Sequence, residues 1–351
     1  MKKLLTSIVL IGTLIGCFSQ DLHFSQIYNS PLTLSPALTG LFTGDQRATI
    51  NFKDQWRSIG KTYRTYAVSY DQGLFKKSMD NAYIGIGGHV FADKAGDLNM
   101  GNTRAQLNLS GILEVNRNQM LSGGMYLGYS QYSIDLSNGQ WDSQYAGNGF
   151  DPSLSTNEQH LTQDSWGHMD VGAGIAWYFE ESSSTLSSYD AFRFKIGASV
   201  SHLNQPRLQY VSSQLSGTER QYMKFIIHAN SFVGIKNTDI SFSPSGAVSI
   251  QGPSLEILVG TMCRVRLREA SKYTGYFKEA AWSIGAHYRV GDAIIPSVFF
   301  EADNFAIGIS YDTTISGLKN TTGAAGGVEL SIRFVNPNPF LYKRSAAIPS
   351  L

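Results

Sequence analysis

The chain has 351 residues with a formal net charge of +1, and only 16% of its residues are charged. That balance gives no electrostatic reason to expect a nucleic-acid partner or a strongly charged substrate. After the first 20 residues there is no apolar stretch of about 18 residues, so the sequence predicts no membrane-spanning helix.

Residues 1–19 are predicted to be a signal peptide. Lysines precede an apolar stretch from Leu4 to Ile15, which has about the length of an export signal and is too short to span a bilayer. Cleavage after Ser19 is favoured, because the barrel predicted below needs no lipid anchor. Lipidation of Cys17 is the alternative. Cleavage after Ser19 would leave Cys263 without a disulfide partner.

Residues 20–45 form a segment that is too apolar for a free tail. Its leucines, phenylalanine and isoleucine would each gain ~1.5–3 kcal/mol from full burial. The residues concerned are Leu22, Phe24, Ile27, Leu34 and Leu38, and the prolines between them are Pro31 and Pro36. We therefore expect a plug or a periplasmic rim segment, with His23 to Gly40 ordered against the periplasmic side of a barrel.

From residue 46 to residue 335 the chain breaks into fourteen short runs in which apolar and polar residues alternate. Alternation with a period of two predicts strands with one apolar and one polar face. The runs are Gln46 to Trp56, Tyr63 to Asp71, Ala82 to Phe91, Thr103 to Val115, Gln119 to Ser133, His168 to Phe179, Phe192 to His202, Met223 to Val233, Phe242 to Gln251, Leu255 to Leu267, Ala280 to Val290, Ala293 to Ala302, Phe305 to Asp312 and Gly326 to Val335. Pro244 and Pro296 make two of these assignments weaker, since proline removes a donor from the ladder.

An even number of strands of this length, behind an export signal, is typical of an outer-membrane barrel. The apolar faces would then contact lipid and the polar faces would line the lumen. The outward-facing side chains would include Leu107, Val171, Ile175, Phe194, Ile257, Ile284, Ile307 and Leu330. A soluble sandwich or a propeller is the alternative, but no repeat of about 40–50 residues marks a propeller.

The lengths of the connections between the predicted strands favour one orientation of the barrel, although the fit is imperfect, because Gly252-Pro253 and Gly291-Asp292 become short outside turns and two inside connections are fairly long. If both termini are periplasmic, the longest connections, 134–167, 203–222 and 313–325, face outside, and the tight turns at 116–118 and 303–304 face the periplasm. The predicted fold is all-β: an antiparallel transmembrane outer-membrane β-barrel of about 14 strands after a cleaved signal peptide. Its parts are the signal peptide (1–19), an N-terminal periplasmic or plug segment (20–45), the transmembrane barrel (46–335) and a C-terminal tail (336–351).

Motifs for catalysis or for cofactor binding are not found. There is no Gly-x-Ser-x-Gly elbow, the histidines lack the spacing of metal ligands, and the glycine pairs lack a phosphate-loop ending. We predict no enzyme activity, no cofactor and no metal. Several arginines share polar strand faces and either line an anion path or, as we favour, pair with Glu256, Glu301 and Glu329 inside the barrel. They are Arg264, Arg266, Arg268, Arg289 and Arg333.

Short motifs in the first half of the chain follow one another in a specific order. His23-Phe24-Ser25-Gln26 comes directly after the predicted signal, and Ser35-Pro36-Ala37 and Gly40 follow. Further motifs are Asp54-Gln55-Trp56, Tyr66 to Gln72, Ala92 to Gly96, Trp141 to Tyr145 and Gly149 to Pro152. In order and spacing they resemble the PorP/SprF family, outer-membrane proteins of the type IX secretion and gliding-motility apparatus of Bacteroidetes. The second half fits mainly as barrel strands.

This resemblance implies an outer-membrane protein that assists export or surface display of a large adhesin-like cargo. It implies contacts with outer-membrane lipid, with the cargo or its C-terminal domain, and with other secretion components. Core machinery and a cargo-specific role both remain open. A second functional class is a transporter or pore for small solutes, including apolar ones.

The candidate partner-binding residues lie in two motifs, because loops carry binding more often than scaffold strands do. One set is predicted on the periplasmic side and the other outside, although both could simply hold the barrel and its loop in shape. They are His23, Phe24, Ser25 and Gln26 in the first set and Trp141, Phe150 and Asp151 in the second.

Overall fold

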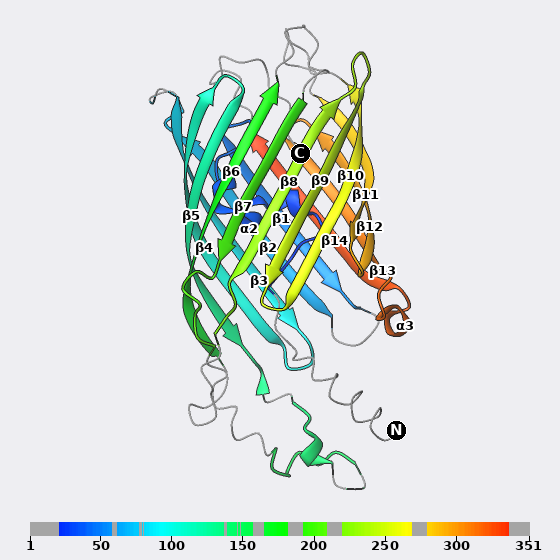
Figure 1. The fold of residues 1–351 in the computed structure, drawn as a ribbon. Coiled ribbons are helices and arrows are strands. Elements are labelled where there is room, and N and C mark those ends of the chain that lie inside the picture. The colour runs from blue at the N-terminus through cyan, green and yellow to red at the C-terminus, as the bar shows by residue number, and fades with distance from the viewer. Residues whose placement is uncertain are drawn as a thin grey trace, which may run out of the picture.

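The computed structural model describes residues 21–57, 62–76, 79, 81–136, 139–145, 147, 149–156, 165–181, 192–208, 220–268 and 279–336. Within these residues, fourteen antiparallel strands pair in chain order, and β1 pairs with β14 to close the barrel (Figure 1). The predicted all-β barrel is confirmed. The predicted signal peptide and the tail beyond Asn336 lie outside the described residues.

The strand bounds agree closely with the predicted runs. The strands are β1 (Gln46–Gln55), β2 (Tyr63–Leu74), β3 (Ala82–Ala95), β4 (Met100–Asn116), β5 (Gln119–Ser133), β6 (Ser165–Glu181), β7 (Phe192–Ser201), β8 (Lys224–Gly234), β9 (Ile240–Gln251), β10 (Ser254–Arg268), β11 (Ala280–Arg289), β12 (Ala293–Ala302), β13 (Phe305–Thr314) and β14 (Ala325–Asn336).

The alternating pattern places apolar side chains on the outside of the wall. Leu107, Ile175 and Ile284 are 73%, 67% and 64% exposed, while inward-facing polar residues of the same strands, Asn108, Asp170 and Ser283, are buried. The other predicted outward residues are exposed or half-buried on the same outer phase. A belt of exposed aliphatic and aromatic side chains costs free energy in water and is stable against lipid.

Both prolines in the predicted runs lie inside strands, and each opens the ladder on one side. Pro244 in β9 stays in register with Thr261 of β10, but the pairing with β8 breaks at that point. Pro296 in β12 pairs with Ala286 of β11, and the pairing with β13 breaks. A proline has no N–H to donate, so each strand keeps full pairing with only one neighbour there.

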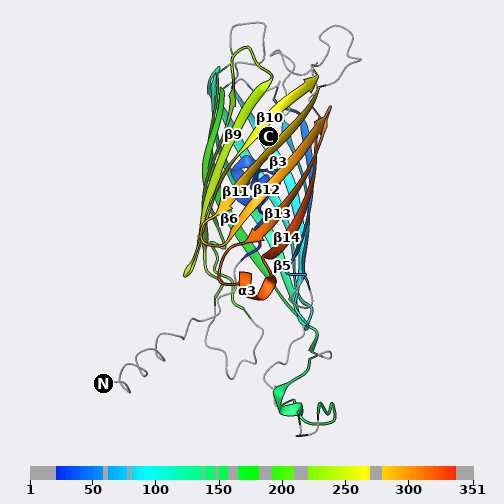
Figure 2. The ribbon, with the colours of Figure 1, turned by 90° about the vertical axis from the view of Figure 1, so that its right-hand side faces the viewer.

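The two ends of the barrel differ. The connection after β5, which contains η4 (Asp142–Gln144), and the connection after β13, which contains α3 (Lys319–Thr322), leave at one end (Figures 1 and 2). We call this the long-loop end. At the opposite end, the short-turn end, β1 begins beside the last residue of β14, and a tight turn joins β4 to β5.

Residues 21–44, which we call the luminal segment, lie inside the barrel. They contain three single-turn helices, η1 (Ile27–Asn29), α2 (Pro31–Leu34) and η2 (Pro36–Leu38), and most of their residues are buried while the rest are half-buried. The prolines begin α2 and η2, where a missing N–H costs nothing. The lumen is therefore filled by the chain's own N-terminal segment.

No helix among the described residues is both long and apolar enough to cross a membrane.

Candidate functional site

The luminal segment crosses the barrel from one end to the other. At the long-loop end Asp21 contacts Arg104, near the start of β4, and His202, just after β7. At the short-turn end the Lys76 ammonium donates to the Gly44 carbonyl at 2.6 Å, and β1 begins two residues later. Residue 21 and the end of β14 therefore lie at opposite ends of the barrel.

Asp21 is fixed at the long-loop end by a buried cluster that we call the mouth cluster. Its carboxylate lies 2.9 Å from His202 Nε2 and 3.4 Å from the Arg104 guanidinium. The other ring nitrogen of His202 lies 2.9 Å from Asp170, and Gln221 donates to Asp21 at 3.4 Å. Two carboxylates therefore share one histidine and one arginine, which satisfies charges that would be costly to bury alone.

Ser25 and Gln26 are bound by carboxylates of the wall. The backbone N–H groups of both residues donate to the two oxygens of Glu329 on β14, at 2.7 and 2.9 Å. The Ser25 hydroxyl donates to Asp312 on β13 at 2.8 Å and accepts from Arg289 on β11 at 2.6 Å. Three strands near the closing seam therefore recognise this dipeptide.

Both ends of the Gln26 side-chain amide are hydrogen-bonded, mainly by the same part of the wall. Its amide nitrogen donates to Ser310 and to the Glu329 carbonyl, both at 3.0 Å. Its amide oxygen accepts from Ser331 at 2.5 Å and from Asn29 at 3.1 Å. An amide with both ends satisfied in a buried site specifies glutamine at this position.

The wall contacts the later part of the luminal segment mainly through the backbone. Side chains of several strands donate to its carbonyl oxygens at 2.5 to 3.4 Å. The donors and the acceptor residues are Gln106 and Leu32, Ser199 and Leu34, Ser122 and Ala37, Arg47 and Leu38, Ser110 and Thr39, and Lys195 and Leu41. In return, the Gly40 N–H donates to Asp71 at 2.7 Å.

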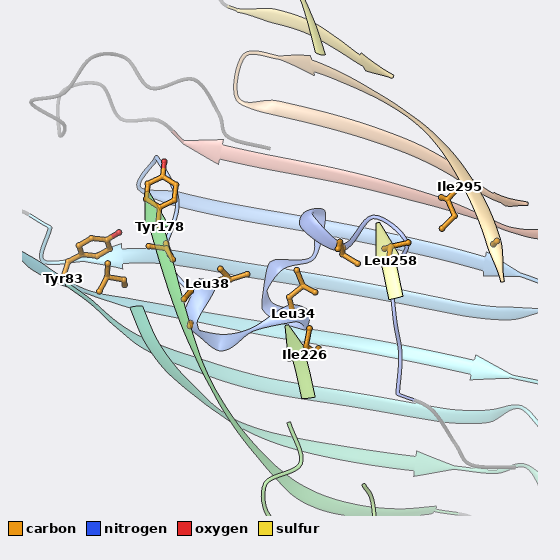
Figure 3. Close-up of a cluster of buried hydrophobic side chains, with 13 residues drawn as sticks. Leu34, Leu38, Tyr83, Tyr178, Ile226, Leu258 and Ile295 are labelled. Atoms are coloured by element: carbon orange, nitrogen blue, oxygen red, sulfur yellow. The ribbon is translucent and has the colours of Figure 1, made fainter. Parts of the chain in front are cut away.

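Apolar side chains of the luminal segment pack against the few apolar positions of the inner wall. Leu34 and Leu38 of the segment belong to one cluster of buried apolar side chains with Ile226, Tyr83 and Tyr178 of the strands (Figure 3). Full burial of a leucine contributes about 1.5–3 kcal/mol, so these contacts stabilise the segment inside the lumen.

Arginines and acidic residues pair inside the barrel, in part as predicted. Arg264 and Arg333 both contact Glu301, at 2.6 and 3.5 Å. Arg289 pairs with Asp312 at 3.0 Å instead of with one of the three predicted glutamates. The prediction missed the luminal segment as a partner: Glu256 faces His23 at 3.4 Å, and Glu329 accepts from the segment's backbone.

The connection after β5 carries an ordered unit. The Gln144 side chain accepts from the Trp141 N–H at 3.3 Å and donates to the Leu154 carbonyl at 3.1 Å. Tyr145 and Phe150 form a bridge with ring centroids 5.6 Å apart, and they are 54% and 36% exposed. The loop therefore presents an aromatic pair to solvent.

Asp151 stabilises this loop from within. Its carboxylate accepts from the Ser153 hydroxyl and N–H, at 2.6 and 2.9 Å. These hydrogen bonds hold the pKa of Asp151 below its ordinary value. Residues 146 and 148 of this motif lie outside the described residues.

The predicted partner-binding residues fall into two different environments. Phe24, Ser25 and Gln26 are buried in the lumen, and His23 is partly buried beside Glu256. Trp141, Phe150 and Asp151 lie in the loop after β5. The two sets were expected at opposite ends of the barrel, but both lie toward the long-loop end, because the luminal segment crosses the barrel before β1 begins.

Several residues at this site were not identified from the sequence. Asp21, Arg104 and His202 form the mouth cluster, and Asp71 and Lys53 contact the luminal segment elsewhere. Their inward phase on the strands was the available signal. Among the described residues, no group of three or more His, Cys, Asp or Glu side chains is arranged to hold a metal ion.

Three solved structures with a similar architecture are distant from this chain in sequence. A FadL homologue from Pseudomonas aeruginosa matches with a TM-score of 0.46 and 9% identity, over 86% of this chain and 92% of that one. BamA from Haemophilus ducreyi, lacking POTRA domains 1–3, matches with a TM-score of 0.39 and 8% identity, over 84% and 70%. A mutant of the ferric enterobactin receptor PfeA from Pseudomonas aeruginosa matches with a TM-score of 0.36 and 8% identity, over 77% of this chain but only 44% of that one.

A search among curated proteins finds no match to this chain. The family model of the type IX secretion system membrane protein PorP/SprF, in contrast, matches residues 16–334. The match extends from the predicted signal to the last strand and includes both the luminal segment and the loop after β5. The chain therefore belongs to the PorP/SprF family of type IX secretion system membrane proteins, and it is an outer-membrane β-barrel.

Proposed function

We propose that this protein is a non-enzymatic component of the type IX secretion system that assists export or surface display of a large adhesin-like protein. The family match over residues 16–334 is the observation that carries this proposal. Its partners would be the secreted protein or its C-terminal domain and other components of the system.

The filled lumen supports a docking role over an open conduit. Residues 21–44 occupy the interior and form hydrogen bonds with strands from both halves of the wall. A folded domain has no room to pass beside them. The alternative, an open pore for small solutes, has less support for the same reason.

The loop after β5 is our candidate contact surface outside the cell. Barrels of this class place long loops outside and short turns in the periplasm, so we assign the long-loop end to the cell surface. The loop is held by its own hydrogen bonds, and it exposes Tyr145 and Phe150. Exposed aromatic residues on an ordered loop are frequent anchors in protein interfaces.

His23 to Gln26 are less accessible to another protein than the loop after β5 is. In the structure their polar groups are bound mainly by the wall, so contact with another protein would require this part of the segment to leave its site. We therefore place the first contact with the secreted protein at Trp141, Phe150 and Asp151.

The test is a deletion strain analysed by surface proteomics beside a solute-uptake assay. We expect one large surface protein to be lost and uptake to remain unchanged. Unchanged surface proteins with impaired uptake of a nutrient would overturn the proposal and favour the transporter.

A second strain tests the loop. Tyr145→Ser with Phe150→Ser should reduce the surface amount of the same protein while the barrel stays in the membrane. Leu203→Ser, which changes an exposed apolar residue of the connection after β7, is the matched control. Equal effects of the two changes would refute the assignment of this loop.

A further inference from the structure

The wall of the lumen binds many backbone carbonyl groups of the luminal segment. Lysine and arginine side chains of β1, β7 and β8, together with Lys76 just after β2, donate to carbonyl oxygens near both ends of the luminal segment. The donors and the acceptor residues are Lys224 and Leu22, Lys53 and His23, Arg47 and Leu38, Lys195 and Leu41, and Lys76 and Gly44, at 2.6 to 3.2 Å. Carbonyl oxygens are present in every peptide, so these contacts do not depend on the residue that carries them.

The charge of the lumen complements this mode of binding. From Leu22 to Gly44 the segment contains no Asp, Glu, Lys or Arg, whereas the inner wall carries all four. Carbonyl oxygens of the segment accept hydrogen bonds from Lys53, Lys195 and Lys224 of the wall. A charged residue at a buried position of the bound peptide would be costly unless it met a partner, as Asp21 does in the mouth cluster.

The segment, which includes three single helical turns, follows a complete path for one polypeptide chain through the lumen. It enters at the long-loop end, where Asp21 is bound, and leaves at the short-turn end, where Gly44 joins it to β1. Gly44 has a φ of +146°, which residues with a side chain rarely adopt. The connection to the wall therefore passes through a backbone conformation that favours glycine.

We propose that the lumen is a binding site for an uncharged polypeptide segment, and that a segment of the secreted partner replaces residues 21–44 there. This proposal rests on the proposed function. The chemical class follows from the contacts: a chain rich in small, apolar and proline residues, with its carbonyls available to lysines and arginines of the wall. In this view the N-terminal segment is the resident occupant of a peptide-binding channel.

The first test locks the resident segment in place within the full-length protein. In a Cys263→Ala background, Ala37→Cys with Ser122→Cys would join the segment to β5, where the Ser122 hydroxyl lies 2.6 Å from the Ala37 carbonyl. The matched control is Thr49→Cys with Ser69→Cys. This pair joins β1 to β2, since the two hydroxyls lie 2.6 Å apart on paired residues of the wall, and it leaves the segment free.

We expect the segment lock to remove the partner from the cell surface, and a reductant to restore it, while the control lock has no effect. The reversal by reductant shows that the locked barrel is folded. Normal display with the segment lock fully oxidised would overturn the proposal.

The second test places a photo-crosslinking amino acid at Asn108, which is 1% exposed and faces the lumen. The neighbouring Leu107 faces outward and serves as the control position. We expect Asn108, but not Leu107, to crosslink to the surface protein that the deletion strain loses. Crosslinks confined to residues 21–44 would refute the proposal that a partner segment occupies the lumen, and they would leave the proposed function intact. If the deletion strain loses no surface protein, the proposed function itself fails.

Discussion

The two halves of the luminal segment are held in different ways. From Asp21 to Asn29, which we call the specific half, side chains as well as backbone groups contact the wall, and the Tyr28 hydroxyl donates to the carbonyls of Ala229 and Gly246. From Ser30 to Gly44, the backbone half, the wall binds carbonyl oxygens and leucine side chains fill apolar contacts. The first mode requires particular residues, and the second requires only an uncharged, mostly apolar chain.

The difference has a physical origin in what each half offers the wall. Serine, glutamine and asparagine side chains present donors and acceptors in fixed directions, so a substitution leaves buried partners unsatisfied. A carbonyl oxygen remains when the side chain changes, and leucine contacts tolerate a replacement of similar volume. The following predictions test this division.

The largest effect is expected at Glu329, which binds two backbone N–H groups of the specific half. Glu329→Ala should lower the free energy of unfolding in detergent by about 4 kcal/mol, since hydrogen bonds to a charged group contribute about 1.5–3 kcal/mol each. Glu329→Gln keeps one acceptor oxygen and should lose less. Equal losses for the two variants would show that the carboxylate has no such role.

The next effect is expected at Gln26. Gln26→Ala should lower the free energy of unfolding by about 3 kcal/mol, because buried partners on β13 and β14 lose their hydrogen bonds. Gln131→Ala, on the outer face of β5, is the control and should stay within about 0.5 kcal/mol. Unfolding titrations of both variants decide the matter. If Gln26→Ala lowers the free energy of unfolding by less than Gln131→Ala does, the side-chain contacts of Gln26 do not stabilise the segment.

Where the backbone half packs closely against the barrel, we expect the structure to require small residues in the wall more than particular residues in the segment. A Cβ atom at Gly124 would lie 2.5 Å from the Pro36 carbonyl carbon, whereas one at the neighbouring Gly123 would meet nothing within 4 Å. Gly124→Ala should therefore cost about 1–3 kcal/mol through overpacking. Gly123→Ala should cost clearly less. Amide exchange of residues 36–39 would report the displacement directly, and unchanged exchange in Gly124→Ala would contradict the close approach.

The smallest effect is expected inside the backbone half. Leu38→Met conserves volume and leaves the carbonyl that accepts from Arg47, so it should cost less than about 1.5 kcal/mol. Thermal unfolding of this variant beside Gln26→Ala compares the two halves on one scale. If Leu38→Met proves the more damaging, the division of the segment is wrong.

The sequence was sufficient for the barrel and insufficient for its contents. Alternation along a run such as Thr103 to Val115 reports which face of a strand is apolar, so strand bounds and outward residues followed from local pattern. The contact between Ser25 and Glu329 joins residues 304 positions apart, and no periodicity records it. The segment from Leu22 to Gly44 has no period at all, so its burial was predictable but its path was not.

The same distinction explains the candidate site. The motif His23 to Gln26 could be identified as unusual, yet its wall partners could not, because nothing in the sequence pairs a glutamine with a particular serine on β14. The loop after β5 was recognised by its length and motifs. Its internal support, such as the Gln144 side chain that contacts Leu154, depends on backbone geometry that has no sequence code.

The barrel, which is closed by β1 and β14, surrounds a chain that passes from one of its ends to the other. This arrangement sets a problem of order during biogenesis. If the wall closed first, Asp21 and the residues before it would have to be pulled through a finished ring lined with charge. If residues 21–44 first bind to the open sheet, β1 and β14 can pair around them, and the segment need not be threaded through a closed barrel. The N-terminal segment then serves as a template around which the barrel closes. The carboxylate of Glu329 holds the segment beside the strand pair that forms last.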